Sequence, residues 1–156
     1  AARMAACQVP VVQINTNGGG RLDAKMINQV LSGFHLDYLD MLIIENVGNL
    51  VCPATYDLGE DMKLLVMSLP EGGDKPAKYP TAFLSSQAVI LNKMDLSPFV
   101  NVDVSEMKKD ILHINPNIRI FETSCRQGYV EGIEELAQYL VDLAQKKRSG
   151  LNKENL

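Results

Sequence analysis

Three side chains that could bind a nucleobase follow directly on a short apolar run. Asn92, Lys93 and Asp95 come after residues 88–91, which read Ala-Val-Ile-Leu. An ionised Asp95 can accept hydrogen bonds from the N1 hydrogen and the 2-amino group of guanine, and adenine has neither donor at these positions. Asn92 would brace the loop and contact N7, and the apolar stem of Lys93 would cover the base. Asn-Lys-x-Asp after a buried strand is typical of the guanine-reading loop of GTPases, and the alternative is a solvated turn.

A second polar segment, Thr123-Ser124-Cys125, follows the apolar run at residues 118–121. GTPases carry a Ser-Ala pair at the corresponding place, where a backbone N–H donates to the O6 atom of guanine. Cys125 can replace the alanine because the backbone supplies that contact. Alone, the segment could equally be a plain polar turn. Its separation from Asp95 by one helix and one strand favours nucleotide binding by Ser124 and Cys125.

A third segment places an acid and a glycine after the apolar run at residues 41–44. Glu45 could hold Mg²⁺ through water, because this ion keeps most of its hydration shell. Gly48 would let the backbone approach the terminal phosphate closely. Taken alone, this segment would be interpreted as an acidic loop with a flexible glycine.

The scaffold for these loops is an alternation of short apolar runs with amphipathic segments. Strands are expected at residues 9–14, 41–44, 63–69, 88–91 and 118–121. Helices are expected from Asp23, which would cap the first one, between Pro98 and Pro116, and from Ile133 onward. This order predicts an α/β fold, a mostly parallel sheet with helices on both faces. Ligands of such sheets bind at the carboxyl ends of the strands, where the three loops lie.

Size and composition fit one ordinary globular domain. The chain has 156 residues, of which 46% are hydrophobic and 22% charged. We expect the α/β domain over residues 1–145 and a flexible tail over residues 146–156, which have no apolar period. A net charge of −4 argues against nucleic acid as a partner. Three scattered cysteines indicate a reducing compartment, and no apolar stretch nears the roughly 18 residues of a membrane span, so we expect a cytoplasmic protein without a membrane partner.

Longer strings resemble one protein family. Residues 45–54 (Glu-Asn-Val-Gly-Asn-Leu-Val-Cys-Pro-Ala), 57–61 (Asp-Leu-Gly-Glu-Asp) and 74–80 (Asp-Lys-Pro-Ala-Lys-Tyr-Pro) are similar in order and spacing to the hydrogenase nickel-incorporation GTPases, the HypB family. Residues 13–16 and 22–24 resemble it too, so the likeness covers nearly the whole chain except the tail. It implies a partial P-loop NTPase fold and a GTPase that uses GTP/GDP and Mg²⁺, dimerises with nucleotide and helps to deliver nickel to hydrogenase.

The resemblance also implies partners and a further pair of site residues. The partners would be a second copy of the chain in a homodimer, a metallochaperone and a hydrogenase precursor. Lys75 and Lys78 resemble the family loop that faces the partner subunit's nucleotide. The alternative for these lysines is a solvated basic turn.

The phosphate loop is the first departure from the family pattern. No Gly-Lys-Thr/Ser string occurs in the sequence, and the glycine cluster at residues 17–20 has no following Lys-Ser/Thr pair. Without the amides and lysine of such a loop the triphosphate has no cradle. We therefore expect the chain as given to bind GTP weakly and not to hydrolyse it, and we assign no catalytic residue. A piece of a longer protein is the favoured explanation.

The metal site is the second departure. The resemblance implies a Cys-His pair before Leu-Asp-Ala and the cysteine of Asn-Leu-Val-Cys-Pro as ligands, and these positions are Gly20, Arg21 and Cys52 here. Glycine has no ligand atom and arginine is permanently protonated, so neither can bind nickel or zinc. Two Cys52 thiolates across a dimer could still hold Ni or Zn weakly, but a partly buried free thiol is the favoured interpretation.

Three functions remain open from the sequence. The first is a GTP-hydrolysing maturation factor for nickel insertion into hydrogenase, with Asn92, Lys93, Asp95, Ser124 and Cys125 reading the base. The second is a non-catalytic dimerising interaction module, which the loss of the Cys-His pair favours. The third is a related GTPase that matures another metalloenzyme.

Overall fold

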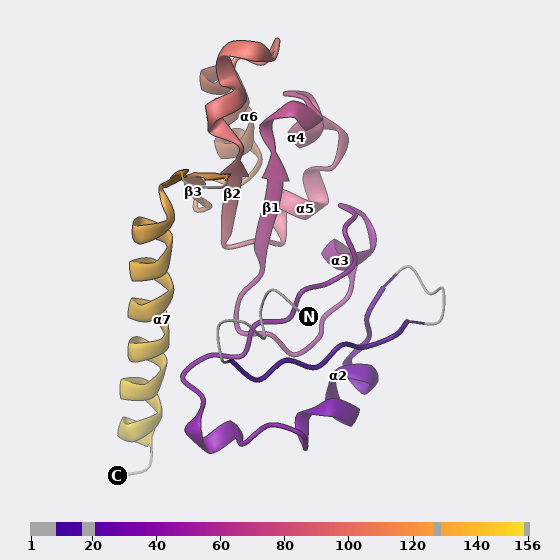
Figure 1. Cartoon of the computed structure of the whole chain (residues 1–156), viewed down its shortest axis with the longest axis vertical. Coiled ribbons are helices and arrows are strands. Elements are labelled where there is room, and N and C mark those ends of the chain that lie inside the picture. The colour runs from indigo at the N-terminus through magenta and orange to yellow at the C-terminus, as the bar shows by residue number, and fades with distance from the viewer. Residues whose placement is uncertain (1–8, 17–20, 127–128, 155–156) are drawn as a thin grey trace. The chain divides into compact units, whose positions relative to one another are not determined.

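The computed structural model describes residues 9–16, 21–126 and 129–154, and these residues form two compact units. The first unit is Ala1–Glu60 and the second is Asp61–Leu156. Figure 1 shows the helices and strands of both units.

A parallel three-stranded sheet is the centre of the second unit, with the strand order β1-β2-β3. The strands are β1 (Leu64–Ser68), β2 (Ala88–Asn92) and β3 (Arg119–Glu122), so the strands expected at residues 63–69, 88–91 and 118–121 are confirmed. Val66, Ile90 and Phe121 lie side by side across the three strands. The first four residues of β2 are buried because this strand has a neighbour on each edge and helices over its faces.

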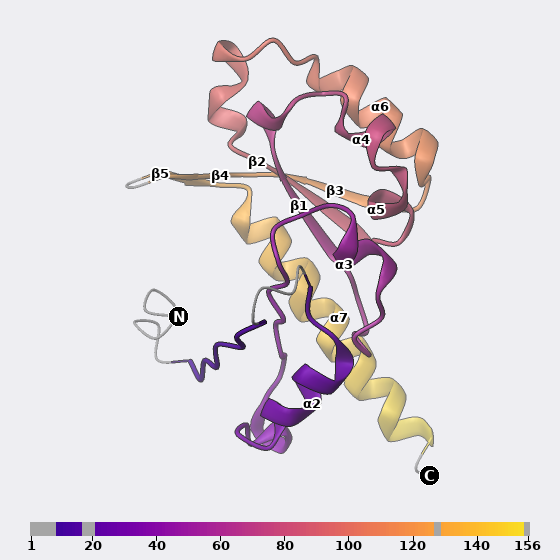
Figure 2. The same ribbon diagram turned by 90° about the vertical axis from the view of Figure 1, so that its right-hand side faces the viewer.

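Helices cover both faces of this sheet, as expected. On one face lie α4 (Lys75–Lys78), α5 (Pro80–Leu84) and α6 (Val104–Ile114), and on the other lies α7 (Ile133–Glu154), as Figures 1 and 2 show together. Alternate residues of a strand point to opposite faces. Ala88, Ile90 and Phe121 accordingly form one buried cluster with Leu136 of α7. Asp103 caps α6 by accepting a hydrogen bond from the Glu106 N–H at 3.0 Å.

Short elements complete the second unit. Two 3₁₀ turns follow the ends of β1 and β2, η2 (Leu69–Glu71) and η3 (Met94–Phe99). An antiparallel hairpin of β4 (Ser124–Arg126) and β5 (Tyr129–Glu131) leads from the sheet into α7. Helix α7 continues through residue 146 to Glu154, so residues 146–154, expected as a loose tail, are helical. Lys147 of α7 pairs with Asp61, and once a helix has begun each further residue extends it at little cost.

The first unit contains short helices and extended segments. Helix α2 (Ala24–Leu31) begins at the expected place, because the Asp23 carboxylate accepts a hydrogen bond from the Met26 N–H at 2.8 Å. The other elements are η1 (Leu36–Tyr38) and α3 (Cys52–Thr55). None of the helices in the described part of the chain is both long and apolar enough to cross a membrane.

The strands expected at residues 9–14 and 41–44 are wrong: within the described residues neither run forms a strand. Their side chains are also not buried, since Val9 and Val12 are each 45% exposed and Ile43 is 71% exposed. An apolar run indicates that a segment can be buried, but a strand also needs a neighbouring strand that forms hydrogen bonds with its backbone N–H and C=O groups. Among the described residues neither run has such a neighbour.

Candidate nucleotide-binding site

The loop after β2 turns sharply at Lys93. This residue has φ 63° and ψ 40°, the left-handed conformation, and it is the non-glycine residue with positive φ among the residues described. Such a conformation costs about 1–2 kcal/mol for a side chain other than glycine. The turn ends β2 at Asn92 and starts η3 at Met94, so the backbone reverses at the carboxyl end of the sheet. Strain of this kind is typical of functional loops.

The segment after β3 holds this turn in place through backbone and side-chain hydrogen bonds. The Asp95 N–H donates to Ser124 Oγ at 3.0 Å, and the Met94 N–H donates to the Thr123 carbonyl at 3.1 Å. Thr123 Oγ1 donates to Asn92 Oδ1 at 3.1 Å. Thr123 and Ser124 are 1% and 0% exposed, so water does not compete for these bonds. Asn92, Lys93, Asp95 and Ser124, predicted from two distant motifs, are therefore brought together.

Asn92 braces the loop as the sequence predicts. Its Oδ1 atom also accepts the Lys93 N–H at 2.8 Å, so both bonds to the loop use the oxygen of the amide. The Nδ2 group is the donor that remains for an acceptor such as N7 of a purine. The role of Thr123 as the partner of Asn92 was missed, because a threonine after a strand carries no signal of its own.

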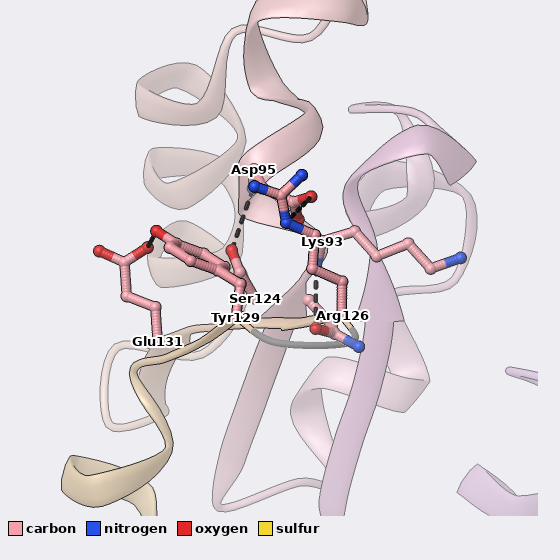
Figure 3. Close-up of polar contacts among 7 residues, drawn as sticks. Lys93, Asp95, Ser124, Arg126, Tyr129 and Glu131 are labelled. Atoms are coloured by element: carbon pink, nitrogen blue, oxygen red, sulfur yellow. Dashed lines mark hydrogen bonds and ion pairs between the residues drawn. The ribbon is translucent and has the colours of Figure 1, made fainter.

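The carboxylate of Asp95 is mostly covered, with 17% of the side chain exposed, and one cation reaches it. Arg126 of β4 lies with Nε 4.0 Å from Asp95 Oδ2, and its guanidinium carbon lies 4.9 Å from the centre of the Tyr129 ring. Tyr129 in turn donates its hydroxyl to Glu131 at 2.6 Å, which raises the pKa of the tyrosine. Figure 3 shows these side chains gathered at the end of the hairpin. No sequence motif points to Arg126, because only the hairpin brings it to Asp95.

Cys125 lies on β4 opposite Val130, with an exposed side chain. Its sulfur is a free thiol. A side chain that points to solvent can change from alanine to cysteine without disturbing the buried neighbours Thr123 and Ser124.

Gly132, between the hairpin and α7, is a further residue that the sequence analysis missed. It has φ 72°, and a Cβ atom there would lie 1.9 Å from the carbonyl oxygen of Glu122. Only glycine fits so close to the backbone that leads into Thr123 and Ser124. The signal was a lone glycine after a strand, which the sequence could not distinguish from an ordinary turn.

Glu45 and Gly48 lie in the first unit, whereas Asp95 and Ser124 lie in the second. Both are exposed, and a Cβ at Gly48 would meet nothing within 4 Å. Asn46 shapes the segment, because its Oδ1 accepts the Val47 N–H at 2.8 Å and the Leu22 N–H at 3.3 Å. An exposed carboxylate beside an open backbone is compatible with a hydrated Mg²⁺ at Glu45.

Lys75 and Lys78 lie on α4 of the second unit. The Lys78 ammonium pairs with Asp74 at 2.5 Å, which raises the pKa of the lysine and lowers that of the aspartate. The Lys75 ammonium lies 5.5 Å from the centre of the Tyr79 ring. Both lysines therefore have partners within their own segment.

The metal site fits poorly in a single chain. Cys52 begins α3 as a half-buried free thiol, and its N–H donates to Asn49 Oδ1 at 2.8 Å. The Arg21 guanidinium stacks 4.0 Å from the centre of the Tyr56 ring, and Gly20 lies outside the described residues. Among the residues described, no three His, Cys, Asp or Glu side chains gather as metal ligands. Cys52 therefore offers one thiolate per chain.

Several known proteins resemble this chain in sequence. The family model described as "CobW/HypB/UreG, nucleotide-binding domain" matches residues 1–122. Hydrogenase maturation factor HypB of Escherichia coli K12 is 44% identical over 140 residues, which are 90% of this chain and 48% of that protein. The same factor of Azotobacter vinelandii is 47% identical over 137 residues, 86% of this chain and 44% of that protein. The chain thus spans about half the length of the curated relatives it matches.

A solved structure extends the likeness to the fold. The crystal structure of HypB from Helicobacter pylori in complex with nickel superposes with a TM-score of 0.84 at 36% sequence identity. The match covers 94% of this chain and 69% of that one, which confirms the expected α/β fold. The chain therefore belongs to the CobW/HypB/UreG nucleotide-binding family, on its HypB branch.

Proposed function

We propose that this chain carries the guanine-reading part of a GTP-binding and GTP-hydrolysing maturation factor that serves nickel insertion into hydrogenase. The observation that carries the proposal is the pair of loops that hold Asp95. The carboxylate stands at the carboxyl end of a parallel sheet, and its own backbone N–H is fixed by the buried Ser124 hydroxyl. A carboxylate held in this way is pre-organised to receive a ligand with two neighbouring N–H groups.

Each loop residue has a role in base recognition. Asp95 accepts the N1 hydrogen and 2-amino group of guanine, and Asn92 uses its Nδ2 group at N7. The backbone N–H at Ser124 and Cys125 donates to O6, and the Lys93 stem covers one face of the base. A site built around a substrate's N–H groups rejects an analogue without them by about 10⁴ or more, because its own polar groups then lack partners.

The phosphate chemistry belongs to the whole protein. Glu45 would hold Mg²⁺ through water and the Gly48 N–H would meet the terminal phosphate, with water as the nucleophile. When bound, Mg²⁺ would neutralise charge that develops on the phosphates. The Gly-Lys-Thr/Ser string that cradles phosphates does not occur in this sequence, so hydrolysis is proposed for the complete factor and no residue of this chain is named as catalytic.

Assembly and nickel transfer are proposed on the same basis. A homodimer would bring Lys75 and Lys78 to the partner subunit's nucleotide, with a metallochaperone and a hydrogenase precursor as further partners. Nickel is the cargo of this process. Cys52 supplies a single thiolate, so any metal, nickel or zinc, held at this position would need the second Cys52 of the dimer.

A second candidate is a dimerising interaction module without metal or GTPase activity. The observation in its favour is Arg21, which occupies a position where the family resemblance places a ligand and whose guanidinium lies 4.0 Å from the centre of the Tyr56 ring. A fixed cation repels a divalent ion.

Binding of nucleosides, which need no phosphate loop, tests the proposal on the chain itself. We expect guanosine to shift the NMR signals of the Lys93 and Asp95 amides, and adenosine to leave them unchanged. Asp95→Asn should weaken guanosine binding by at least about 100-fold and favour xanthosine, because the amide donates where the carboxylate accepted.

The matched control is Asp110→Asn, which removes the same charge from an exposed position on α6. It should leave guanosine binding unchanged. An Asp95→Asn protein that keeps its preference for guanosine would overturn the proposal.

A further inference from the structure

We infer that Arg126 competes with guanine for the carboxylate of Asp95, so that a base must displace this arginine in order to bind. The inference rests on the proposed reading of guanine by Asp95. It adds a residue that sets the affinity of the site, and Arg126 is not part of either motif found in the sequence.

The geometry places Arg126 against the group that the base needs. Its Nε lies 4.0 Å from Asp95 Oδ2, and the arginine side chain is 65% exposed while that of Asp95 is 17% exposed. The covered carboxylate therefore has little open surface, and part of it faces the guanidinium. Figure 3 shows the guanidinium group of Arg126, which extends from the hairpin, beside Asp95.

The arginine and the base can use the same oxygens of this carboxylate. A guanidinium presents N–H donors on nitrogens that share one carbon, and the N1–C2–N2 edge of guanine has the same arrangement. Both edges match the two oxygens of a carboxylate. Since the accessible part of Asp95 accommodates one such edge at a time, the pair with Arg126 must break when guanine binds.

The hairpin gives the displaced arginine a second position. The guanidinium carbon is 4.9 Å from the centre of the Tyr129 ring, within the range of a cation–π contact. Tyr129 is held in turn by its hydrogen bond to Glu131 at 2.6 Å. Arg126 can leave Asp95 and keep its contact with the ring, so Arg126 lowers the affinity for guanine only slightly.

The size of the effect follows from the exposure of the pair. Breaking an ion pair whose cation is exposed to solvent lowers an affinity by about two- to five-fold, and salt reduces this factor by screening. Because guanosine is uncharged, salt affects its binding mainly through the Arg126–Asp95 pair. Guanosine should therefore bind the wild-type chain more tightly as the salt concentration rises.

Arg126→Met in the full chain tests the inference, because it keeps the apolar stem and removes every donor. We expect the dissociation constant of guanosine, measured by NMR titration, to fall about two- to five-fold at low salt and to lose its salt dependence. The control Lys109→Gln removes one positive charge from an exposed position on α6 and should bind as the wild type does.

The outcomes separate the two proposals. If Asp95→Asn abolishes guanosine binding but Arg126→Met binds guanosine equally or more weakly than the wild type, the competition is overturned and the base reading stands. Weaker binding would mean that Arg126 contacts the base instead. If neither the wild type nor Arg126→Met binds guanosine at this loop, the proposed function fails and the inference fails with it.

Discussion

Replacing Gly132 by alanine should destabilise the second unit. The same change should also loosen the loop after β2 that carries Asp95. The glycine has φ 72°, and an added Cβ would lie 1.9 Å from the Glu122 carbonyl oxygen and 3.3 Å from Thr123 Cα. A left-handed alanine costs about 1–2 kcal/mol, and forcing an atom into packed surroundings costs about 1–3 kcal/mol. The expected loss is therefore about 2–5 kcal/mol, a large part of the 5–15 kcal/mol by which domains are usually stable.

Urea unfolding followed by circular dichroism measures this loss. The midpoint should fall while the slope m stays constant, because the native contacts weaken without a change in the surface exposed on unfolding. Guanosine binding should weaken in the same protein, since the obstructed backbone leads directly into Thr123 and the Ser124 hydroxyl that holds Asp95.

Gly150 of α7 provides the matched control. Its φ is not positive and a Cβ there would meet nothing within 4 Å, so Gly150→Ala should leave stability unchanged or raise it by up to about 1 kcal/mol. A Gly132→Ala protein as stable as the Gly150→Ala protein would refute the argument that this close approach needs glycine.

Three further predictions follow from the same loops and from Cys52. Ser124→Ala should lower the free energy of unfolding by about 1–3 kcal/mol in urea, because it leaves the Asp95 N–H without its buried acceptor, and an unchanged midpoint would contradict that role. The hydrogen bond to Glu131 raises the pKa of Tyr129, so it stabilises the folded state below about pH 10, and this stability is lost as the pH rises through the pKa of Tyr129 in the folded protein. Glu131→Gln should make this tyrosine ionise at lower pH in an ultraviolet titration. Cys52→Ser should take up as little nickel or zinc as the wild-type chain in equilibrium dialysis, and stoichiometric uptake that disappears in the variant would show that Cys52 is a ligand.

The sequence predicted the second unit better than the first, for a physical reason. Residues 88–91 read as a buried strand and are one, because β1 and β3 satisfy the backbone of β2 on both edges. Residues 41–44 have the same apolar character, yet Ile43 is 71% exposed and no strand forms there in the described part of the chain. Apolar pattern is a local property, whereas pairing depends on what lies alongside.

The residues of the candidate site divide in the same way. Asn92, Lys93, Asp95 and Ser124 could be found from the sequence, because each motif places a fixed chemistry at a strand end. Arg126 and Gly132 could not be found, since their importance comes from the hairpin, which brings one to Asp95 and the other against Glu122.

Selectivity and affinity for a nucleotide need not come from the same residues. The groups that fix Asp95 all belong to the second unit, so discrimination between guanine and adenine can be complete in these two loops. Most of the affinity for a triphosphate comes from backbone amides and a lysine around the phosphates, together with Mg²⁺. A base site without those contacts is expected to be selective and weak. At such low affinity, the two- to five-fold opposition expected from Arg126 is enough to decide whether the site is filled at a given nucleoside concentration.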